Sequence, residues 1–367
     1  MTGTAWTTQR RLTRRGVLWL GLQCDVRCKF CYDELVPADE KGWIPPAEAF
    51  ARLDAFRRDY ANEHVDLMGG EPTLYPHVLD IVRHAAAIGL RPTVITHGMR
   101  LADTDLVDKY AAAGVHDFLV SVQGIGETLA AVHRRGRDNF AKQVRALDNL
   151  SAAGVPFRFN VTMIRDNVEQ LPAIADLAGE KGARVVNFLT YNPYFEWTDA
   201  PSIPFQLRHS EVAPHLATAI DRCTALGIEA NVRYLPICQL PGREPHVYTG
   251  HQLPFDTHEW DYNSWYGEGH PAPPPEKWYR DASRHQAERH QYRKPPPCAG
   301  CALRNVCDGF HAQYLERWGS EEARPYPGEP TDDPTVFIGS QRKLEYTAAP
   351  QGPGVDAPPA AEDPPTL

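Results

Sequence analysis

The sequence has no long apolar run, and this absence excludes a membrane-spanning helix. No stretch of its 367 residues approaches the roughly 18 to 20 consecutive apolar residues that such a helix needs. The apolar stretch Gly16–Leu22 is too short for the core of a signal peptide and lacks a cleavage site of small residues, so we interpret it as a strand. We therefore expect a cytoplasmic protein.

The sequence also lacks an excess of basic residues. Its 38 lysines and arginines are outnumbered by 47 acidic residues, which gives a net charge of −9. A nucleic-acid-binding domain usually carries a basic patch or stripe, so this balance argues against nucleic acid as a partner. Without an export signal, the eight cysteines are expected to be metal ligands or free thiols and not disulfides.

What is present from residue 16 to about 190 is an alternation of short β-branched runs with amphipathic stretches of helical length. Six β/α units in a row predict an α/β fold with a parallel sheet, open or curled into a barrel. In both cases the chemistry belongs at the carboxyl ends of the strands. The expected strands are Val17–Gln23, His64–Met68, Thr93–Thr96, Phe118–Val122, Phe157–Met163 and Val185–Leu189, and the expected helices span 46–60, 76–88, 103–113, 138–153 and 169–180.

After Tyr191 the pattern becomes less regular. One helix is expected at Ser210–Leu226 and a short strand at Ile228–Tyr234, while 240–297 is rich in Pro, His, Trp and Tyr without a clear period. Such a long irregular segment in a folded chain is either a functional loop or needs a staple. The expected organisation is an N-terminal extension (1–15), a barrel (16–190), a smaller irregular C-terminal domain (191–346) and a disordered Pro/Ala-rich tail (347–367).

Three cysteines, Cys24, Cys28 and Cys31, follow directly after the first expected strand. A loop there can turn all three sulfurs toward one point, and thiolates are the natural ligands of iron–sulfur clusters. Three ligands on a four-iron cluster leave one iron open to a substrate or cosubstrate. A structural zinc site with a distant fourth ligand, or buried thiols, are the alternatives that the spacing leaves open.

The spacing Cys-x3-Cys-x2-Cys, with Phe30 before the last cysteine, resembles the defining motif of the radical S-adenosylmethionine (SAM) superfamily. The resemblance implies a [4Fe–4S] cluster whose free iron binds SAM, and reductive cleavage of SAM to methionine and a 5′-deoxyadenosyl radical that abstracts hydrogen. It also implies a partial (β/α)6 TIM-like barrel with this loop after its first strand, and a position for Phe30 near the adenine. The cofactor would bring the difficult chemistry, and the protein would orient it.

A second segment, Gly69-Gly70-Glu71-Pro72, ends the second expected strand and resembles the GGEP motif of the same family. There the backbone carbonyls and the glutamate hold the SAM ammonium group, and glycine lets the backbone approach the ligand closely. The two motifs together indicate a SAM-cleaving site much more specifically than either motif does alone.

Weaker resemblances follow on later strands. Ser121 is a candidate contact to the SAM ribose or carboxylate, although Gln123 replaces the acid usual two positions on. Arg135, in a His-Arg-Arg-Gly segment, is a candidate partner of the SAM carboxylate. Asn160 is a candidate cofactor contact on the fifth strand. Asn187, Thr190 and His97 also lie at the expected end of the barrel, where each is more simply explained as an ordinary structural residue.

A second cysteine cluster comprises Cys298, Cys301 and Cys307. It resembles the SPASM or shorter twitch extensions of radical SAM maturases, which implies an auxiliary [4Fe–4S] cluster, although the spacing by itself also suits zinc. His311 occupies the position of the family's next cysteine, and no cysteine follows Cys307, so two complete auxiliary clusters are not expected. The fourth ligand of one cluster is left as Cys238, His311 or an open iron, and Cys223 is expected in the core.

Three functions are compatible with these motifs. The first is a radical SAM oxidoreductase acting on a small sugar- or nucleoside-like substrate in natural-product biosynthesis, by dehydrogenation, epimerisation, decarboxylation or sulfur insertion. The second is a maturase of a ribosomally made peptide; only 23 residues precede Cys24, fewer than a leader-binding domain takes, which favours the small substrate. The third is a non-enzymatic zinc or redox-sensing protein, which leaves Gly69–Pro72 unexplained. The chemistry of the first two implies an electron donor such as flavodoxin or ferredoxin.

Overall fold

The computed structural model describes residues 6–7, 15–31, 36–59, 62–192, 205–248, 291–332, 336–337 and 343–344. Within these ranges, eight strands form one parallel sheet in the order β2 to β9 along the chain. Its strands are β2 (Arg15–Trp19), β3 (His64–Met68), β4 (Arg91–Thr96), β5 (Asp117–Ser121), β6 (Phe157–Met163), β7 (Val185–Thr190), β8 (Glu229–Arg233) and β9 (Val247–Tyr248).

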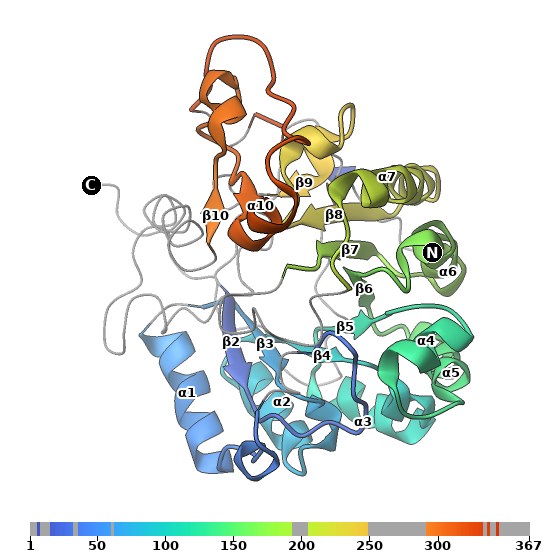
Figure 1. The fold of residues 1–367 in the computed structure, drawn as a ribbon. Helices are drawn as coiled ribbons and strands as arrows, with labels where there is room; N and C mark the ends of the chain where they lie inside the picture. The colour runs from blue at the N-terminus through green and yellow to red at the C-terminus, as the bar shows by residue number, and fades with distance from the viewer. Residues whose placement is uncertain are drawn as a thin grey trace.

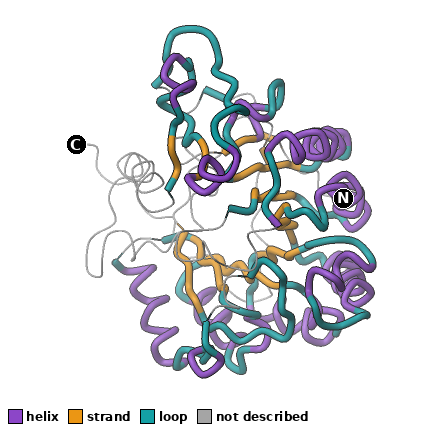
Figure 2. The backbone as a smooth tube through the Cα atoms, in the orientation of Figure 1, coloured by secondary structure: helices purple, strands orange, loops and turns teal. Residues whose placement is uncertain are grey.

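Helices cover the outer side of this curved sheet, as Figures 1 and 2 show. The helices are α1 (Pro46–Arg58), α2 (Val78–Ala87), α3 (Thr104–Ala113), α4 (Glu127–His133), α5 (Asn139–Ala152), α6 (Leu171–Lys181) and α7 (His209–Ala225). The boundaries follow local chemistry. The Asp103 side chain, for example, accepts from the Asp105 N–H at the start of α3, and Gly114 ends that helix in the left-handed region. The expected α/β partial barrel is confirmed.

The sheet departs from the sequence expectation at its far edge. β8 pairs with β7 in parallel and β9 pairs with β8, so the sheet continues past residue 190. The helix α4 was not expected from the sequence, because it is a short helix between a glycine turn and a run of arginines. The first strand ends at Trp19, so Leu20–Gln23 forms an extended approach to the cysteine loop and not part of the strand.

The inner face of the barrel is polar near the amino ends of its strands. Arg15 on β2 pairs with Asp66 on β3, and Arg158 Nε on β6 donates to Asp117 Oδ2 on β5 at 2.6 Å. Burial raises the pKa of Asp66 to about 6 even though Arg15 opposes that shift. Buried charges need partners, so this network closes one end of the barrel and leaves the carboxyl ends of the strands for chemistry.

The described C-terminal region lies beyond the β8–β9 edge of the sheet (Figure 1). It contains the antiparallel pair β10 (Tyr292–Arg293) and β11 (Phe310–His311), followed by α10 (Ala312–Trp318). The His209 ring at the start of α7 stacks on Tyr314 of α10 at 3.8 Å between centroids, which fastens this region to the barrel. A further two-stranded pair joins β1 (Trp6–Thr7) to β12 (Lys343–Leu344).

Several expectations fall outside the described residues. These are the disordered tail at 347–367, most of the N-terminal extension, and the part of the irregular segment from 249 to 290. In the described part of the chain, no helix is long and apolar enough to cross a membrane.

Candidate functional site

The cysteine loop and the Gly-Gly-Glu-Pro segment lie directly against each other at the carboxyl ends of β2 and β3. The Gly70 N–H donates to the Gly21 carbonyl at 2.8 Å, and the Glu71 N–H donates to the Gln23 carbonyl, also at 2.8 Å. Cys24 is the next residue. The two motifs are therefore joined by backbone hydrogen bonds immediately before the first thiol.

This close approach requires glycine. A Cβ on Gly69 would lie 2.1 Å from the Gly21 carbonyl oxygen, and one on Gly70 would lie 2.2 Å from the Gln23 carbonyl oxygen. Gly69 also has φ +139°, which side chains rarely allow. Both glycines thus bring the two backbones together, so the loop that carries the thiols and the segment after β3 form one surface.

The Glu71 side chain is buried, and both of its carboxylate oxygens accept hydrogen bonds from the protein. One carboxylate oxygen accepts from the Thr73 N–H at 3.1 Å and from the hydroxyls of Thr73 and Thr96, each at 2.6 Å. The other accepts from the His97 N–H at 2.9 Å. The carboxylate therefore fixes the ends of β3 and β4 relative to each other. The Glu71 carbonyl accepts from the Leu74 N–H at 3.0 Å, which leaves the Gly69 and Gly70 carbonyls as the backbone acceptors of this segment for a ligand.

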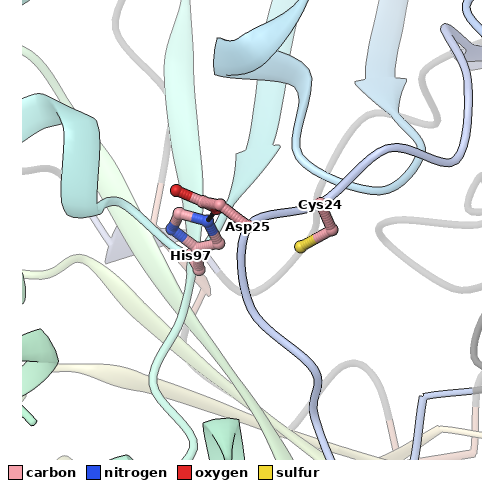
Figure 3. A group of neighbouring side chains, drawn as sticks. All are labelled: Cys24, Asp25 and His97. Carbon is pink, nitrogen blue, oxygen red and sulfur yellow. Dashed lines mark hydrogen bonds and ion pairs between the residues drawn. The ribbon is translucent and has the colours of Figure 1, made fainter. Parts of the chain in front are cut away.

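His97 lies between the carboxylates of Asp25 and Glu71. Figure 3 shows the His97 ring against Asp25, with Cys24 next to them on the same loop as Asp25. His97 Nε2 lies 2.7 Å from Asp25 Oδ1 and 3.2 Å from Glu71 Oε2. Burial by itself lowers the pKa of His97, but the Glu71 charge and the Asp25 hydrogen bond outweigh burial and raise it to about 10. The Met99 N–H donates to His97 Nδ1 at 3.2 Å, and this hydrogen bond disfavours a proton on Nδ1 because that nitrogen acts as the acceptor.

Cys24, Asp25 and His97 each offer a ligand atom, and these atoms lie within 4.8 Å of one another. A thiolate, a carboxylate and an imidazole are a donor set that also suits zinc. The carboxylates of Asp25 and Glu71 already contact His97 Nε2, however, so we interpret this ring as a support for the cysteine loop.

The rest of the cysteine loop is held by the end of α4 and by the turn after β6. The Arg27 N–H donates to the His133 carbonyl at 2.9 Å, and the Lys29 N–H donates to the Val132 carbonyl at 3.0 Å. The Lys29 ammonium also pairs with Asp166. Cys28, between the two tethered residues, is thus placed by contacts from two different β/α units, those of α4 and β6. No sequence signal marked Asp166, because the contact joins distant parts of the chain.

A polar row crosses the inner face of the sheet near the site. Ser121, Asn160, Asn187 and Asn231 stand in register on the neighbouring strands β5 to β8. Residues paired in this way face the same side of a parallel sheet. Asn231 donates to Asn187 at 3.0 Å, whereas the buried Asn160 Oδ1 has no partner within the described residues. A buried acceptor that the protein leaves unsatisfied fits a bound ligand with a donor group.

The remaining sequence candidates fall into three environments. Phe30 is half-buried, with its ring 6.4 Å from that of Tyr191. Gln123 is buried and binds the Thr162 N–H at 2.9 Å, which makes it a brace between β5 and β6. Arg135 is exposed, and the described residues give its guanidinium no ion pair. Pro72 is buried at the start of a short 3-10 helix, and Thr190 Oγ1 is buried with no partner among described residues.

Four cysteines of the C-terminal half line one recess. Cys298, Cys301 and Cys307 are joined there by Cys238, which comes from the short 3-10 helix after β8. His311 is not among the residues that line this recess. It is buried beside Tyr292, and its Nδ1 accepts from the Gln313 N–H at 3.3 Å. Cys223 is fully buried in α7, as a core residue.

N–H groups point at these sulfurs. The Tyr326 N–H lies 3.3 Å from Cys301 Sγ, the Gly309 N–H 3.4 Å from Cys307 Sγ, and the Gln239 side-chain amide 3.2 Å from Cys238 Sγ. Burial raises the pKa of Cys298 to about 11 and that of Cys307 to about 12. Free thiols here would stay protonated, whereas a metal deprotonates them, and N–H donors then stabilise the thiolates. The donor set fits a metal or an iron–sulfur cluster.

Comparison with known proteins identifies the family. Residues 20–178, from the approach to the cysteine loop to α6, match the family model of the radical SAM superfamily. The chain belongs to the radical SAM superfamily. Its defining region is the barrel with the apposed cysteine loop and Gly-Gly-Glu-Pro segment, so the site and the family match agree.

Two groups of curated radical SAM relatives are similar to about half of this chain. A PqqA peptide cyclase of Xanthomonas campestris pv. campestris is 28% identical over 188 residues, which cover 49% of this chain and 47% of the relative. An AdoMet-dependent heme synthase of Oleidesulfovibrio alaskensis is 28% identical over 160 residues, 44% of this chain and 41% of the relative. The chain thus spans about half the length of the curated relatives it matches.

Among solved structures, Streptococcus suis SuiB bound to the precursor peptide SuiA has a similar fold. The TM-score is 0.55 at 16% identity, covering 87% of this chain and 76% of SuiB. At this level of identity the likeness concerns the fold alone. It extends past the radical SAM barrel into the C-terminal region.

Proposed function

We propose that this chain cleaves SAM reductively and removes a hydrogen atom from a peptide substrate. The observation that carries the SAM site is the apposition of Gly69–Glu71 with the cysteine loop through two backbone hydrogen bonds. The peptide substrate is supported by the similarity of the barrel to a protein named PqqA peptide cyclase. The expectation of a sugar- or nucleoside-like substrate has weaker support among the relatives.

In this proposal Cys24, Cys28 and Cys31 hold a [4Fe–4S] cluster. Such a cluster, when bound, supplies one electron to SAM and an open iron that orients it. The chain's own contribution is positional. The backbone carbonyls of Gly69 and Gly70 would accept from the SAM ammonium, while Ser121, Asn160 and the half-buried Phe30 would contact the nucleoside part.

A second metal site is assigned to the C-terminal cysteines. We favour Cys238 as the fourth ligand because it lines the same recess as Cys298, Cys301 and Cys307. His311 is a weaker candidate because its ring is buried outside that recess and already accepts a backbone hydrogen bond. Reconstituted protein should therefore hold roughly eight irons, with Cys301→Ala retaining about half. Stoichiometric zinc in place of iron at this site would contradict the assignment.

The first experiment tests SAM cleavage and does not depend on the substrate. After anaerobic reconstitution, the chain is supplied with SAM and dithionite, and 5′-deoxyadenosine is quantified. Cys28→Ala should abolish its formation, because the variant lacks one of three ligands. Cys223→Ala is the matched control, since this thiol is buried in α7 away from both sites, and it should retain cleavage. Retained cleavage in Cys28→Ala would refute the ligand assignment.

The second experiment distinguishes a peptide from a small molecule. Short peptides encoded beside the gene are prepared with deuterium at carbon and supplied with SAM and dithionite. Transfer of deuterium into 5′-deoxyadenosine identifies the substrate directly, because the label marks the abstracted hydrogen. A parallel panel contains sugars, nucleosides and haem precursors. The haem precursors represent the second candidate function, which the similarity to AdoMet-dependent heme synthase favours. Transfer from that panel alone would overturn the peptide proposal.

A further inference from the structure

Tyr326 contacts the recess of the C-terminal cysteines through its backbone. Its N–H lies 3.3 Å from Cys301 Sγ, and its carbonyl accepts from the Ala302 N–H at 2.9 Å. Tyr326 stands between Pro325 and Pro327, and proline has no backbone N–H, so Tyr326 supplies the N–H donor of this stretch. The segment therefore runs along Cys301 and Ala302 and directs its N–H at the sulfur.

The phenol of Tyr326 is held by a distant part of the chain. Its hydroxyl donates to Glu244 Oε1 at 2.6 Å, and the same oxygen accepts from the Gly242 N–H at 2.9 Å. Burial by itself raises the pKa of Glu244, but these hydrogen bonds outweigh burial and lower it, so the side chain is a charged acceptor. Glu244 begins the short 3-10 helix that leads into β9, so the phenol is anchored to the edge of the barrel sheet.

An N–H group directed at a ligand sulfur changes the affinity of an iron–sulfur cluster for an electron. Reduction adds negative charge to the cluster, and its sulfurs then accept hydrogen bonds more strongly. A donor held at the sulfur therefore stabilises the reduced state more than the oxidised state and raises the reduction potential. The donor has this effect only while it stays in place, so the residue that anchors it also controls the potential.

We propose that Tyr326, anchored by Glu244, is a positioning residue that raises the reduction potential of the cluster assigned to the C-terminal cysteines. This inference rests on the proposed function, because it assumes the second metal site. On reduction the cluster gains one electron from the reductant, which is oxidised, and no covalent bond forms or breaks. Tyr326 keeps its proton and its electrons and holds its N–H at Cys301 Sγ. A contact with the edge of the barrel thus sets the affinity of the C-terminal cluster for an electron.

The test is a redox titration of the full reconstituted chain with dithionite and mediators, followed by electron paramagnetic resonance. The potential that disappears in Cys301→Ala belongs to the C-terminal cluster. Tyr326→Phe should lower this potential, because a less firmly held N–H stabilises the reduced cluster less. The equilibrium constant for reduction should fall about threefold to tenfold, and a tenfold fall is about 59 mV for one electron. The control Tyr75→Phe also removes a phenol hydrogen bond, to the Ile44 carbonyl at 2.8 Å in the barrel, and should leave the potential unchanged.

A double-mutant cycle separates positioning by Glu244 from the effect of the phenol itself. Glu244→Gln keeps an oxygen that accepts from the phenol, so Tyr326→Phe should lower the potential in this background as it does in the wild type. Glu244→Ala removes the acceptor, so Tyr326→Phe should then have little further effect. Each comparison is made within one background, so the charge lost from Glu244 cancels. An equal shift in the Glu244→Ala background would show that Tyr326 acts without Glu244 and would overturn the inference.

Three other results would also overturn the inference. The first is an unchanged potential in Tyr326→Phe, and the second is an equal shift in the Tyr75→Phe control. The third is loss of iron from the C-terminal site in Tyr326→Phe, which would show that the phenol holds the ligands together and does not tune the cluster. Iron content is therefore measured on every variant.

Zinc in place of iron at the C-terminal site would instead contradict the proposed metal assignment. Cobalt(II) loaded into the same site of the full chain then decides the role of Tyr326, because an N–H donor stabilises the sulfur electrons. Tyr326→Phe should shift the thiolate-to-cobalt charge-transfer absorption to longer wavelength. An unshifted band would overturn the inference without regard to which metal the site holds.

Discussion

Replacing Glu71 with glutamine tests whether this carboxylate supports the site or binds the ligand. Its two oxygens accept from the backbone N–H groups of Thr73 and His97 and from two threonine hydroxyls. The amide of glutamine has only one oxygen, so in either orientation its NH2 group faces one of these backbone N–H groups. The variant therefore loses a charge and leaves at least one buried donor without an acceptor.

The magnitude follows from the burial of this network. Glu71 is 1% exposed, so water cannot replace the lost partner. A buried hydrogen bond to a charged group contributes about 1.5–3 kcal/mol, and we expect Glu71→Gln to lower the free energy of unfolding by about 3 kcal/mol. With an unfolding entropy of roughly 2.1 cal/mol/K per residue over the 264 residues that the structure describes, the thermal midpoint falls by about 5 °C.

The assay is thermal unfolding of the reconstituted chain without SAM, followed by circular dichroism. Glu127→Gln is the matched control, because this glutamate is exposed at the start of α4 and its loss should change the free energy of unfolding by about 0.5 kcal/mol or less. If Glu71 acted only on SAM, the SAM-free midpoint would not move and only SAM affinity would fall. That result would refute the supporting role inferred from its hydrogen bonds.

Three further predictions follow from individual residues. Gly69→Ala should weaken SAM binding at least tenfold, because backbone strain of about 1–3 kcal/mol displaces the Gly69–Glu71 segment. Gly42→Ala, whose added Cβ would meet nothing within 4 Å, should bind SAM as wild type does. Equilibrium dialysis measures both affinities, and equal affinities would contradict the role of Gly69–Glu71 in binding SAM. Cys238→Ser should lose the C-terminal metal while His311→Phe keeps it, as measured by metal content; the reverse pattern would favour the histidine ligand. Burial lowers the pKa of His209 to about 3, below its unfolded value near 6.5, so the free energy of unfolding falls as the pH falls between these values. In urea unfolding, His209→Phe should reduce the fall in this free energy between pH 7 and 5 by about 2 kcal/mol. An unchanged fall would show that the ring is not held neutral.

The sequence predicted the barrel well because its strands and helices are encoded locally. The expected strands His64–Met68 and Phe157–Met163 match β3 and β6 residue for residue. The helix boundaries are close because caps such as Asp103 and Gly114 act within a few residues of the helix they limit. The expected sheet was too short because the pairing of β8 with β7 is not encoded locally. It depends on how α7 returns the chain to the sheet and not on the pattern of the strand itself.

The site could be predicted only where its residues are close in sequence. Cys24, Cys28 and Cys31, like Gly69–Pro72, lie close together in the sequence, so their resemblance to the family's motifs can be recognised without coordinates, and the ligand roles proposed for them stay predictions. The roles of Gln123 and Glu71 could not be inferred, because both depend on what lies opposite them. Gln123 replaces an acid in the family pattern, yet its amide braces two strands.

By itself, the sequence determined the class of the protein: the thiol spacing and the glycine-rich turn at the ends of successive strands are local features, and their resemblance to the motifs of the radical SAM superfamily indicates SAM chemistry. Only the tertiary structure decided that Cys238 lines the same recess as the other C-terminal thiols and His311 does not, that the Glu71 carboxylate accepts hydrogen bonds from the protein, and that the end of α4 binds the backbone on either side of Cys28. Each depends on a contact between residues far apart in the chain, and such contacts arise from the path of the backbone and the packing of side chains around it.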